Sequence, residues 1–302
     1  MGELSTSGRP VALPSMTTAH DAAPDTADAA VDLALALELA DAADAISLAR
    51  FGAGDLRVAE KPDMTPVSDA DLAVETALRG ILAERRPGDA VIGEEFGAGA
   101  DPSADTPAVR AGRGRAWVID PIDGTKNFVR GVPIWATLIA LLIEGVPALG
   151  VVSAPALARR WWGSPGLGAF TRFSGGSQRP CQVSAVRDLA HASLSLAQPV
   201  AWEAAGRGEA AAALSRRAWR TRGYGDFFPY MLLAEGAVDA AGEPELSLWD
   251  LAALAPIVAA AGGTFSTIEG AAIDASATSA LATNGLLHPV LEAGLARGVR
   301  HT

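Results

Sequence analysis

The stretch Trp117-Val118-Ile119-Asp120-Pro121-Ile122-Asp123-Gly124-Thr125-Lys126-Asn127-Phe128 carries two carboxylates directly behind an apolar run. We expect residues 115–119 to form a buried strand and residues 120–125 to form a turn that opens a short helix. Asp120 and Asp123 stand three residues apart across that turn, a spacing that lets both carboxylates face one metal pair. The stretch therefore predicts a metal site at the end of a strand.

The same turn supplies further ligand atoms. The carbonyl oxygen of Ile122 is free to act as an additional metal ligand, and Thr125 places a hydroxyl beside the carboxylates. If a helix begins here, the N–H groups of Asp123, Gly124 and Thr125 point toward an anion. A phosphate group could then touch the metal and the start of the helix at once.

Three more acidic clusters lie at predicted strand ends or helix starts. They are Asp69 with Asp71, Glu94 with Glu95, and Asp250. Carboxylates at the ends of different strands converge in one cleft, and they repel one another unless a cation neutralises them. Hard oxygen ligands of this kind suit Mg²⁺ or Mn²⁺. Each cluster taken alone is better explained as a turn or as a charge in the first turn of a helix than as part of a metal site, so the prediction rests on their joint occurrence.

The overall composition is that of a globular protein with an acidic surface. The 302 residues are 49% hydrophobic and carry a net charge of −11, which argues against nucleic acid or an anionic membrane as a partner. Cys181 is the only cysteine, so an intrachain disulfide and a cysteine-based zinc site are excluded. No apolar run is long enough to span a bilayer, and residues 1–24 lack the features of a signal peptide. We expect a cytoplasmic protein.

Helical and strand-like patterns alternate along the chain without a detectable repeat, which favours a layered α/β or α+β fold. Helices are expected near residues 26–51, 69–85, 209–215, 227–235, 248–261 and 289–296, and strands near residues 56–60, 90–93, 115–119, 136–143, 148–153, 193–196 and 238–241. A Gly/Ser-rich segment, residues 163–180, is the expected boundary between two subdomains. We therefore divide the chain into a disordered extension (1–24), a subdomain with most of the metal ligands (25–170) and a subdomain with Asp250 and the substrate-reading residues (171–302).

Three motifs together resemble the signatures of the inositol monophosphatase family. They are Gly93-Glu94-Glu95, the stretch 117–128 quoted above, and Trp249-Asp250-Leu251-Ala252-Ala253 with Ala261-Gly262-Gly263 after it. The motifs are long and correctly ordered, and the resemblance covers roughly residues 27–296. It implies a layered α-β-α-β-α sandwich of the inositol monophosphatase and fructose-1,6-bisphosphatase type. It also implies a lithium-sensitive, homodimeric phosphatase that depends on Mg²⁺.

The resemblance further implies a set of metal ligands. The first metal would be bound by Glu94, Asp120 and the carbonyl of Ile122. The second would be bound by Asp120, Asp123 and Asp250. Each site would hold two or three Mg²⁺ ions, with Mn²⁺ as a possible substitute.

Other matching residues would act on water and phosphate. Glu94 and Thr125 would orient the attacking water, and Asp71 would hold Thr125 in place. Asp123, Gly124 and Thr125 would bind the phosphate group. No protein nucleophile is needed in such a mechanism, because water attacks the phosphorus directly.

The C-terminal half resembles the histidinol-phosphatase branch of this family. The resemblance is carried by Gly225-Asp226 before an aromatic helix, by Glu243-Pro244-Glu245 before Trp249-Asp250, and by Asn284-Gly285-Leu286-Leu287-His288. L-histidinol phosphate carries an ammonium and an imidazole beside its phosphate, so Asp226 and Glu243 would offer it anionic partners. For Asp226, the role of N-cap of a helix that begins at Phe227 is an equally good prediction.

Two other functions compete with hydrolysis of L-histidinol phosphate to L-histidinol and phosphate. One is an inositol-1-monophosphatase or a broad-specificity sugar or polyol phosphatase of the same family. The other is a non-catalytic interaction protein that keeps the fold, which the complete set of acidic residues disfavours. A small phosphate monoester is the expected partner in the first two cases.

Overall fold

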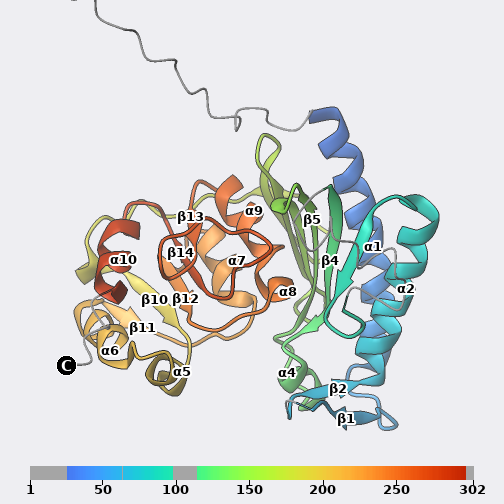
Figure 1. Ribbon diagram of the computed structural model, residues 1–302, viewed down its shortest axis with the longest axis horizontal. Coiled ribbons are helices and arrows are strands. Elements are labelled where there is room, and N and C mark those ends of the chain that lie inside the picture. The colour runs from blue at the N-terminus through green and yellow to red at the C-terminus, as the bar shows by residue number, and fades with distance from the viewer. Residues whose placement is uncertain (1–25, 63, 98–113, 297–302) are drawn as a thin grey trace, which may run out of the picture.

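The computed structural model describes residues 26–62, 64–97 and 114–296, and these residues form five alternating layers of helices and sheets (Figure 1). The predicted extension (1–24) and nearly all of the loop between Glu95 and the following strand lie outside the described residues. None of the helices in the described ranges is long and apolar enough to cross a membrane.

Two long helices form the first outer layer. They are α1 (Thr26–Arg50) and α2 (Asp69–Arg85), and a small hairpin of β1 (Val58–Glu60) and β2 (Pro66–Ser68) connects them. Helix α2 begins where the sequence predicted, because Ser68 caps it and the Asp71 carboxylate accepts a hydrogen bond from the Ser68 N–H at 2.9 Å. Leu39 and Leu78 of these helices pack against Trp117 and Ile139 of the neighbouring sheet.

The second layer is a seven-stranded sheet with the strand order β3-β4-β5-β6-β7-β8-β9. Strands β3 and β4 are parallel, and every later pair is antiparallel. The strands are β3 (Ala90–Gly93), β4 (Arg115–Asp123), β5 (Ala136–Ile143), β6 (Val146–Ala154), β7 (Arg159–Ser164), β8 (Gly168–Phe173) and β9 (Arg179–Pro180). A five-residue helix, α4 (Thr125–Val129), lies between β4 and β5, and a 3₁₀ turn (Pro155–Leu157) lies between β6 and β7.

The Gly/Ser-rich segment at residues 163–180 is therefore largely part of this sheet. Strand β8 spans the position after residue 170 at which we divided the chain, and the chain leaves the sheet only after β9. Several glycines in the segment, such as Gly166 with φ 88°, make the turns between strands. The division into two subdomains stays a prediction.

The middle layer consists of α7 (Phe228–Ala234), α8 (Leu248–Leu251) and α9 (Leu254–Ala260), which lie between the two sheets (Figure 1). The single helix expected over residues 248–261 is wrong, because the chain forms two helices there. Pro256 explains the break: it has no N–H to bond to the preceding turn, so it fits only in the first turn of a new helix.

The fourth layer is a five-stranded sheet with the order β11-β10-β12-β14-β13, in which β10 is parallel to both β11 and β12 while β14 is antiparallel to its neighbours. Its strands are β10 (Ser193–Leu196), β11 (Arg220–Thr221), β12 (Ala240–Glu243), β13 (Thr264–Ser266) and β14 (Ala280–Thr283). The outermost helices are α5 (Pro199–Ala204), α6 (Gly208–Arg217) and α10 (His288–Ala296), and a 3₁₀ turn (Leu189–His191) precedes β10. The predicted α-β-α-β-α sandwich is confirmed.

Candidate active site

A β-bulge in strand β4 decides which way the two central aspartates face. Val118 points into the middle layer and Ile119 toward α1 and α2, so Asp120 continues on the middle-layer side. In a regular strand Asp123, three residues later, would point to the opposite side. The register shifts between them, with Asp120 opposite Leu138 and Asp123 opposite Ala136, so β4 advances three residues while β5 advances two. The extra residue returns Asp123 to the same side as Asp120.

This bulge corrects the sequence prediction for residues 120–125. The segment was expected to be a turn that opens a short helix. The short helix is present as α4, but Asp120 to Asp123 remain in the strand and Gly124 alone separates the strand from that helix. Pro121 fits within the bulge because an irregular pairing does not require its missing N–H. Ile122, which is fully buried, anchors the bulge in a small apolar cluster with Phe128 and Trp135.

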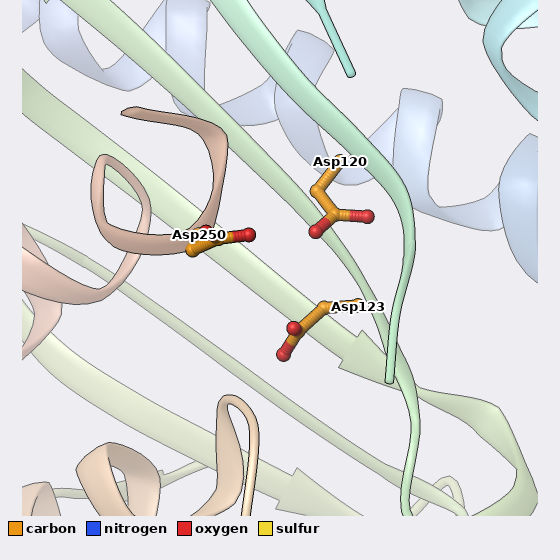
Figure 2. Close-up of side chains that lie close together, drawn as sticks. All are labelled: Asp120, Asp123 and Asp250. Atoms are coloured by element: carbon orange, nitrogen blue, oxygen red, sulfur yellow. The ribbon is translucent and has the colours of Figure 1, made fainter. Parts of the chain in front are cut away.

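Helix α8 adds a third carboxylate to this side of the sheet. Carboxylate oxygen atoms of Asp120, Asp123 and Asp250 all lie within 4.8 Å of one another, and Figure 2 shows the three groups turned toward a common space. Asp250 is held there by a capping box, in which its Oδ2 accepts the N–H of Ser247 at 2.7 Å. Strand β4 and helix α8, far apart in sequence, thus build one acidic cluster.

The environment of this cluster is unfavourable for charge. Asp120 is 1% exposed, and its Oδ1 atom has no hydrogen-bond partner among the described residues. Burial raises the pKa of Asp120 well above its usual range, and the nearby carboxylates of Glu94, Asp123 and Asp250 raise it further. Burial likewise raises the pKa of Asp250 to about 7, although the Ser247 N–H stabilises its charge.

These observations fit a divalent cation. Converging, poorly hydrated carboxylates with an unpartnered oxygen have lone pairs available to a metal and a charge that only a cation offsets. The donors are all oxygen atoms, as hard ions such as Mg²⁺ require.

Glu94 reaches the cluster from the neighbouring strand. Its N–H donates to the carbonyl of Ile119 at 3.1 Å directly after β3, and its carboxyl lies close enough to Asp120 to raise the pKa of that group. Lys61 Nζ lies 2.8 Å from Oε1 of Glu94 and 2.8 Å from Oε1 of Glu95. Burial raises the pKa of Glu95 to about 7. Within the described residues, Lys61 thus neutralises the side of the cluster that faces the β1–β2 hairpin.

Thr125 and Asp71 meet as the resemblance implied. Thr125 Oγ1 lies 3.3 Å from Asp71 Oδ1 and 3.0 Å from the carbonyl oxygen of Ile122. The other oxygen of Asp71 accepts the hydroxyl of Ser68 at 2.5 Å, so the carboxylate is fixed from both sides. Gly124 precedes Thr125 with φ 86°, a left-handed conformation that glycine adopts without strain. Contacts of Gly124 and Thr125 with phosphate stay a prediction.

A cavity of about 1000 Å³ joins the cluster to the predicted substrate-reading residues. Asp123 and Asp250 line it at the metal end, and Asp226, Glu243 and Glu245 line it elsewhere. The acidic groups thus continue beyond those that a metal would occupy.

Asp226 does not cap helix α7, so that alternative for its role is wrong. The helix begins at Phe228, and Asp226 lies before it in a left-handed conformation with φ 52°. Its Oδ2 instead accepts a hydrogen bond from Asn127 Nδ2 at 2.8 Å, and the next N–H, that of Phe227, donates to Asp123 Oδ2 at 2.6 Å. The Asp226–Phe227 segment is therefore tied to the metal side of the cavity at two points.

Glu243 ends strand β12 and accepts a hydrogen bond from the hydroxyl of Tyr230 at 3.2 Å. Burial raises the pKa of Glu243 to about 8, against the stabilising effect of that hydrogen bond. Tyr230 also lines the cavity and is 1% exposed.

Sequence reasoning missed three residues at this site: Lys61, Asn127 and Tyr230. Lys61 stands in a two-proline loop with no motif to mark it, so no local signal was available. Asn127 belongs to the quoted stretch 117–128, two residues after Thr125. Tyr230 follows Asp226 by four residues, a helical spacing that could have suggested a shared face.

Comparison with known proteins agrees with this architecture. The sequence model of the inositol monophosphatase family matches residues 28–301. The chain is 53% identical over 257 residues to the histidinol-phosphatase of Mycobacterium tuberculosis, a match that covers 85% of this chain and 95% of that protein. It is 54% identical over 265 residues to the histidinol-phosphatase of Streptomyces coelicolor, with 86% and 95% covered.

Solved structures show the same fold. An inositol monophosphatase from Zymomonas mobilis superposes with a TM-score of 0.74 at 31% identity, covering 89% of this chain and 98% of that one. The extragenic suppressor protein SuhB from Bartonella henselae superposes with a TM-score of 0.77 at 26% identity, covering 89% and 100%. With its five layers, its acidic cluster and these matches, the chain belongs to the inositol monophosphatase family.

Proposed function

We propose that this protein is a Mg²⁺-dependent phosphatase that hydrolyses L-histidinol phosphate to L-histidinol and phosphate. The chain is a phosphoric monoester hydrolase of the inositol monophosphatase family. The observation that carries the substrate assignment is the cavity, which joins the metal-type carboxylate cluster to two further half-buried acids, Asp226 and Glu243.

The metal ligands we propose are Glu94, Asp120, Asp123, Asp250 and the carbonyl oxygen of Ile122. The convergence of three of these carboxylates and the unpartnered oxygen of Asp120 support the assignment. When bound, Mg²⁺ would supply an activated water and offset negative charge on the phosphoryl oxygens.

The protein's own residues would orient the reactants around that cluster. Glu94 would accept a hydrogen bond from the attacking water, and the hydroxyl of Thr125 would fix the same water from the other side. Asp71 keeps Thr125 in position, because its carboxylate is itself held by Ser68. Asp123, Gly124 and Thr125 would bind the phosphate group at the start of the short helix α4.

Electrostatics support L-histidinol phosphate over a neutral polyol phosphate. The organic part of histidinol phosphate carries an ammonium and an imidazole, and both are attracted to anionic partners. Asp226 and Glu243 are paired with neutral donors, the amide of Asn127 and the phenol of Tyr230. Two relatives with more than half of their aligned residues identical carry the name histidinol-phosphatase.

Phosphate release from a panel of esters tests the proposal. The purified protein with Mg²⁺ should hydrolyse L-histidinol phosphate with a kcat/KM at least tenfold above that for myo-inositol 1-phosphate and fructose 1,6-bisphosphate. Glu243→Gln should remove most of this preference. A higher kcat/KM for myo-inositol 1-phosphate would reject the substrate assignment and leave the phosphatase assignment standing.

A homodimer, inhibition by Li⁺ and a cytoplasmic location belong to the same proposal, and membership in the family supports them. Light scattering on the purified protein should give twice the chain mass of 30.8 kDa. A monomeric mass at assay concentration would reject the dimer.

A further inference from the structure

Tyr230 is fixed more tightly than a residue that merely lines a cavity. It lies in the first turn of α7, is 1% exposed, and stacks on Phe265 with ring centroids 5.5 Å apart and an interplanar angle of 27°. Packing therefore holds the ring, and the position of its hydroxyl follows from the ring.

That hydroxyl is directed at Glu243. The two groups come from different elements, helix α7 and strand β12, and the Tyr230 hydroxyl lies 3.2 Å from Glu243 Oε1. Glu243 is itself fixed at the backbone, since it pairs with Ala280 in the sheet. A rigid donor and a rigid main chain leave the carboxylate of Glu243 few orientations.

The neutral donor of Glu243 contrasts with the arginine partners of several other acids in the described part of the chain. Asp32 pairs with Arg115, Glu75 with Arg79 and Glu235 with Arg159. An arginine fixes a carboxylate but also neutralises it. A phenol fixes the carboxyl group without supplying a positive charge, so a cation in the cavity remains the partner that would stabilise the ionised form of Glu243.

We infer that Tyr230 is a positioning residue for substrate specificity, holding the Glu243 carboxylate in the orientation that receives the cationic group of the substrate's organic part. This inference rests on the proposed function and names a residue that acts through Glu243. Tyr230 does not touch the acidic cluster in any described contact, so its effect should fall on recognition of the organic part and not on the phosphoryl group.

The test removes the hydroxyl alone. Tyr230→Phe retains the ring that stacks on Phe265. The KM for L-histidinol phosphate should rise about tenfold, the change expected for losing one hydrogen bond to a charged group. The value of kcat should change less than twofold. As an inhibitor, L-histidinol should bind about tenfold more weakly, while inorganic phosphate should inhibit as it does the wild type.

A double-variant cycle separates positioning from a general packing effect. Because Tyr230 acts through Glu243, adding Tyr230→Phe to Glu243→Gln should change the KM no further. Tyr224→Phe is the matched control: Tyr224 also lines the cavity, but its hydroxyl pairs with Arg220 Nη2 at 3.1 Å and not with Glu243. Thermal melts should show that each variant folds.

The outcomes distinguish the two levels of the proposal. If wild-type protein prefers L-histidinol phosphate but Tyr230→Phe leaves its KM unchanged, the positioning role is overturned alone. Equal weakening of inhibition by L-histidinol and by phosphate, or additive effects in the double variant, would overturn it as well. If L-histidinol does not inhibit the wild type at all, the substrate assignment fails and this inference fails with it.

Discussion

Replacing Asp120 with Asn should stabilise the metal-free protein while it abolishes phosphate release. The substitution keeps the shape of the side chain and removes one charge from three carboxylates whose oxygen atoms lie within 4.8 Å of one another. Two unit charges at that distance repel by about 3 kcal/mol at an effective dielectric constant of 20. The actual cost is smaller, because carboxyl groups of the cluster take up protons and so avoid part of the repulsion.

The pKa of Asp250 gives a second measure of the cost. A carboxyl whose pKa rises from 3.8 to about 7 on folding destabilises the folded state by about 4 kcal/mol at pH 8. The repulsion energy and the cost of the raised Asp250 pKa are upper limits on what one substitution can relieve. We therefore expect Asp120→Asn to raise the free energy of unfolding of the metal-free protein by about 2–3 kcal/mol. For a chain of 302 residues, that corresponds to a rise in Tm of roughly 3–5 °C.

The sign of the pH dependence follows from the raised pKa. An unfolded aspartate loses its proton near pH 4, whereas burial keeps Asp250 protonated to about pH 7, so the folded state is penalised increasingly between these values. The advantage of Asp120→Asn should therefore be largest at pH 8 and should fall by more than half at pH 5.

Differential scanning calorimetry in EDTA at pH 5 and pH 8 measures both effects. The matched control is Asp55→Asn, which removes a carboxylate 83% exposed at a surface ion pair and should shift the Tm little and without this pH trend. Saturating Mg²⁺ should reverse the order, because the wild type gains binding energy that the variant has lost. A metal-free Asp120→Asn protein no more stable than the wild type at pH 8 would refute the reasoning.

Three further substitutions or modifications have defined outcomes. Gly93→Ala should lower the free energy of unfolding by about 2–4 kcal/mol in a urea titration, because the added Cβ would lie 2.0 Å from Oε1 of Glu75. Glu75 cannot easily move away, since its carboxylate accepts hydrogen bonds from the N–H of Glu95 and from Arg79. An unchanged urea midpoint would contradict this prediction. Thr125→Ala should lower kcat about 100-fold with little change in KM, and Thr125→Ser should restore most of it, whereas equal loss in both variants would argue against a role for the hydroxyl. Burial raises the pKa of the Cys181 thiol to about 12, so the thiol should resist alkylation by iodoacetamide at pH 8 until the protein unfolds in urea. Rapid labelling of the native protein, measured by mass spectrometry, would disprove its burial.

Local features of the chain were predictable from the sequence, because they depend on neighbouring residues. The capping box at Ser68 and Asp71 is set within one helical turn, and α2 begins where the pattern placed it. The strand over residues 90–93 was likewise predicted with its observed bounds. The family motifs around Asp120 and Asp250 indicated the layered fold before any contact between layers was known.

Contacts between distant elements were decided by the tertiary structure. A regular strand would have turned Asp123 away from Asp120, and only the pairing of β4 with β5 shows the bulge that places both on one side. Asp226 could have capped a helix, but in the folded chain Asn127, 99 residues away, takes its carboxylate.

The difference between the two kinds of feature is physical. A sequence pattern records which side chains a segment carries and which local conformation they favour. The register of a strand pair and the meeting of side chains from separate layers depend on how whole elements pack. The sequence by itself therefore determined that carboxylates would gather near Asp120 and Asp123. The tertiary structure decided which way these carboxylates face, and it decided that Tyr230 is the neutral donor that holds Glu243 farther along the cavity.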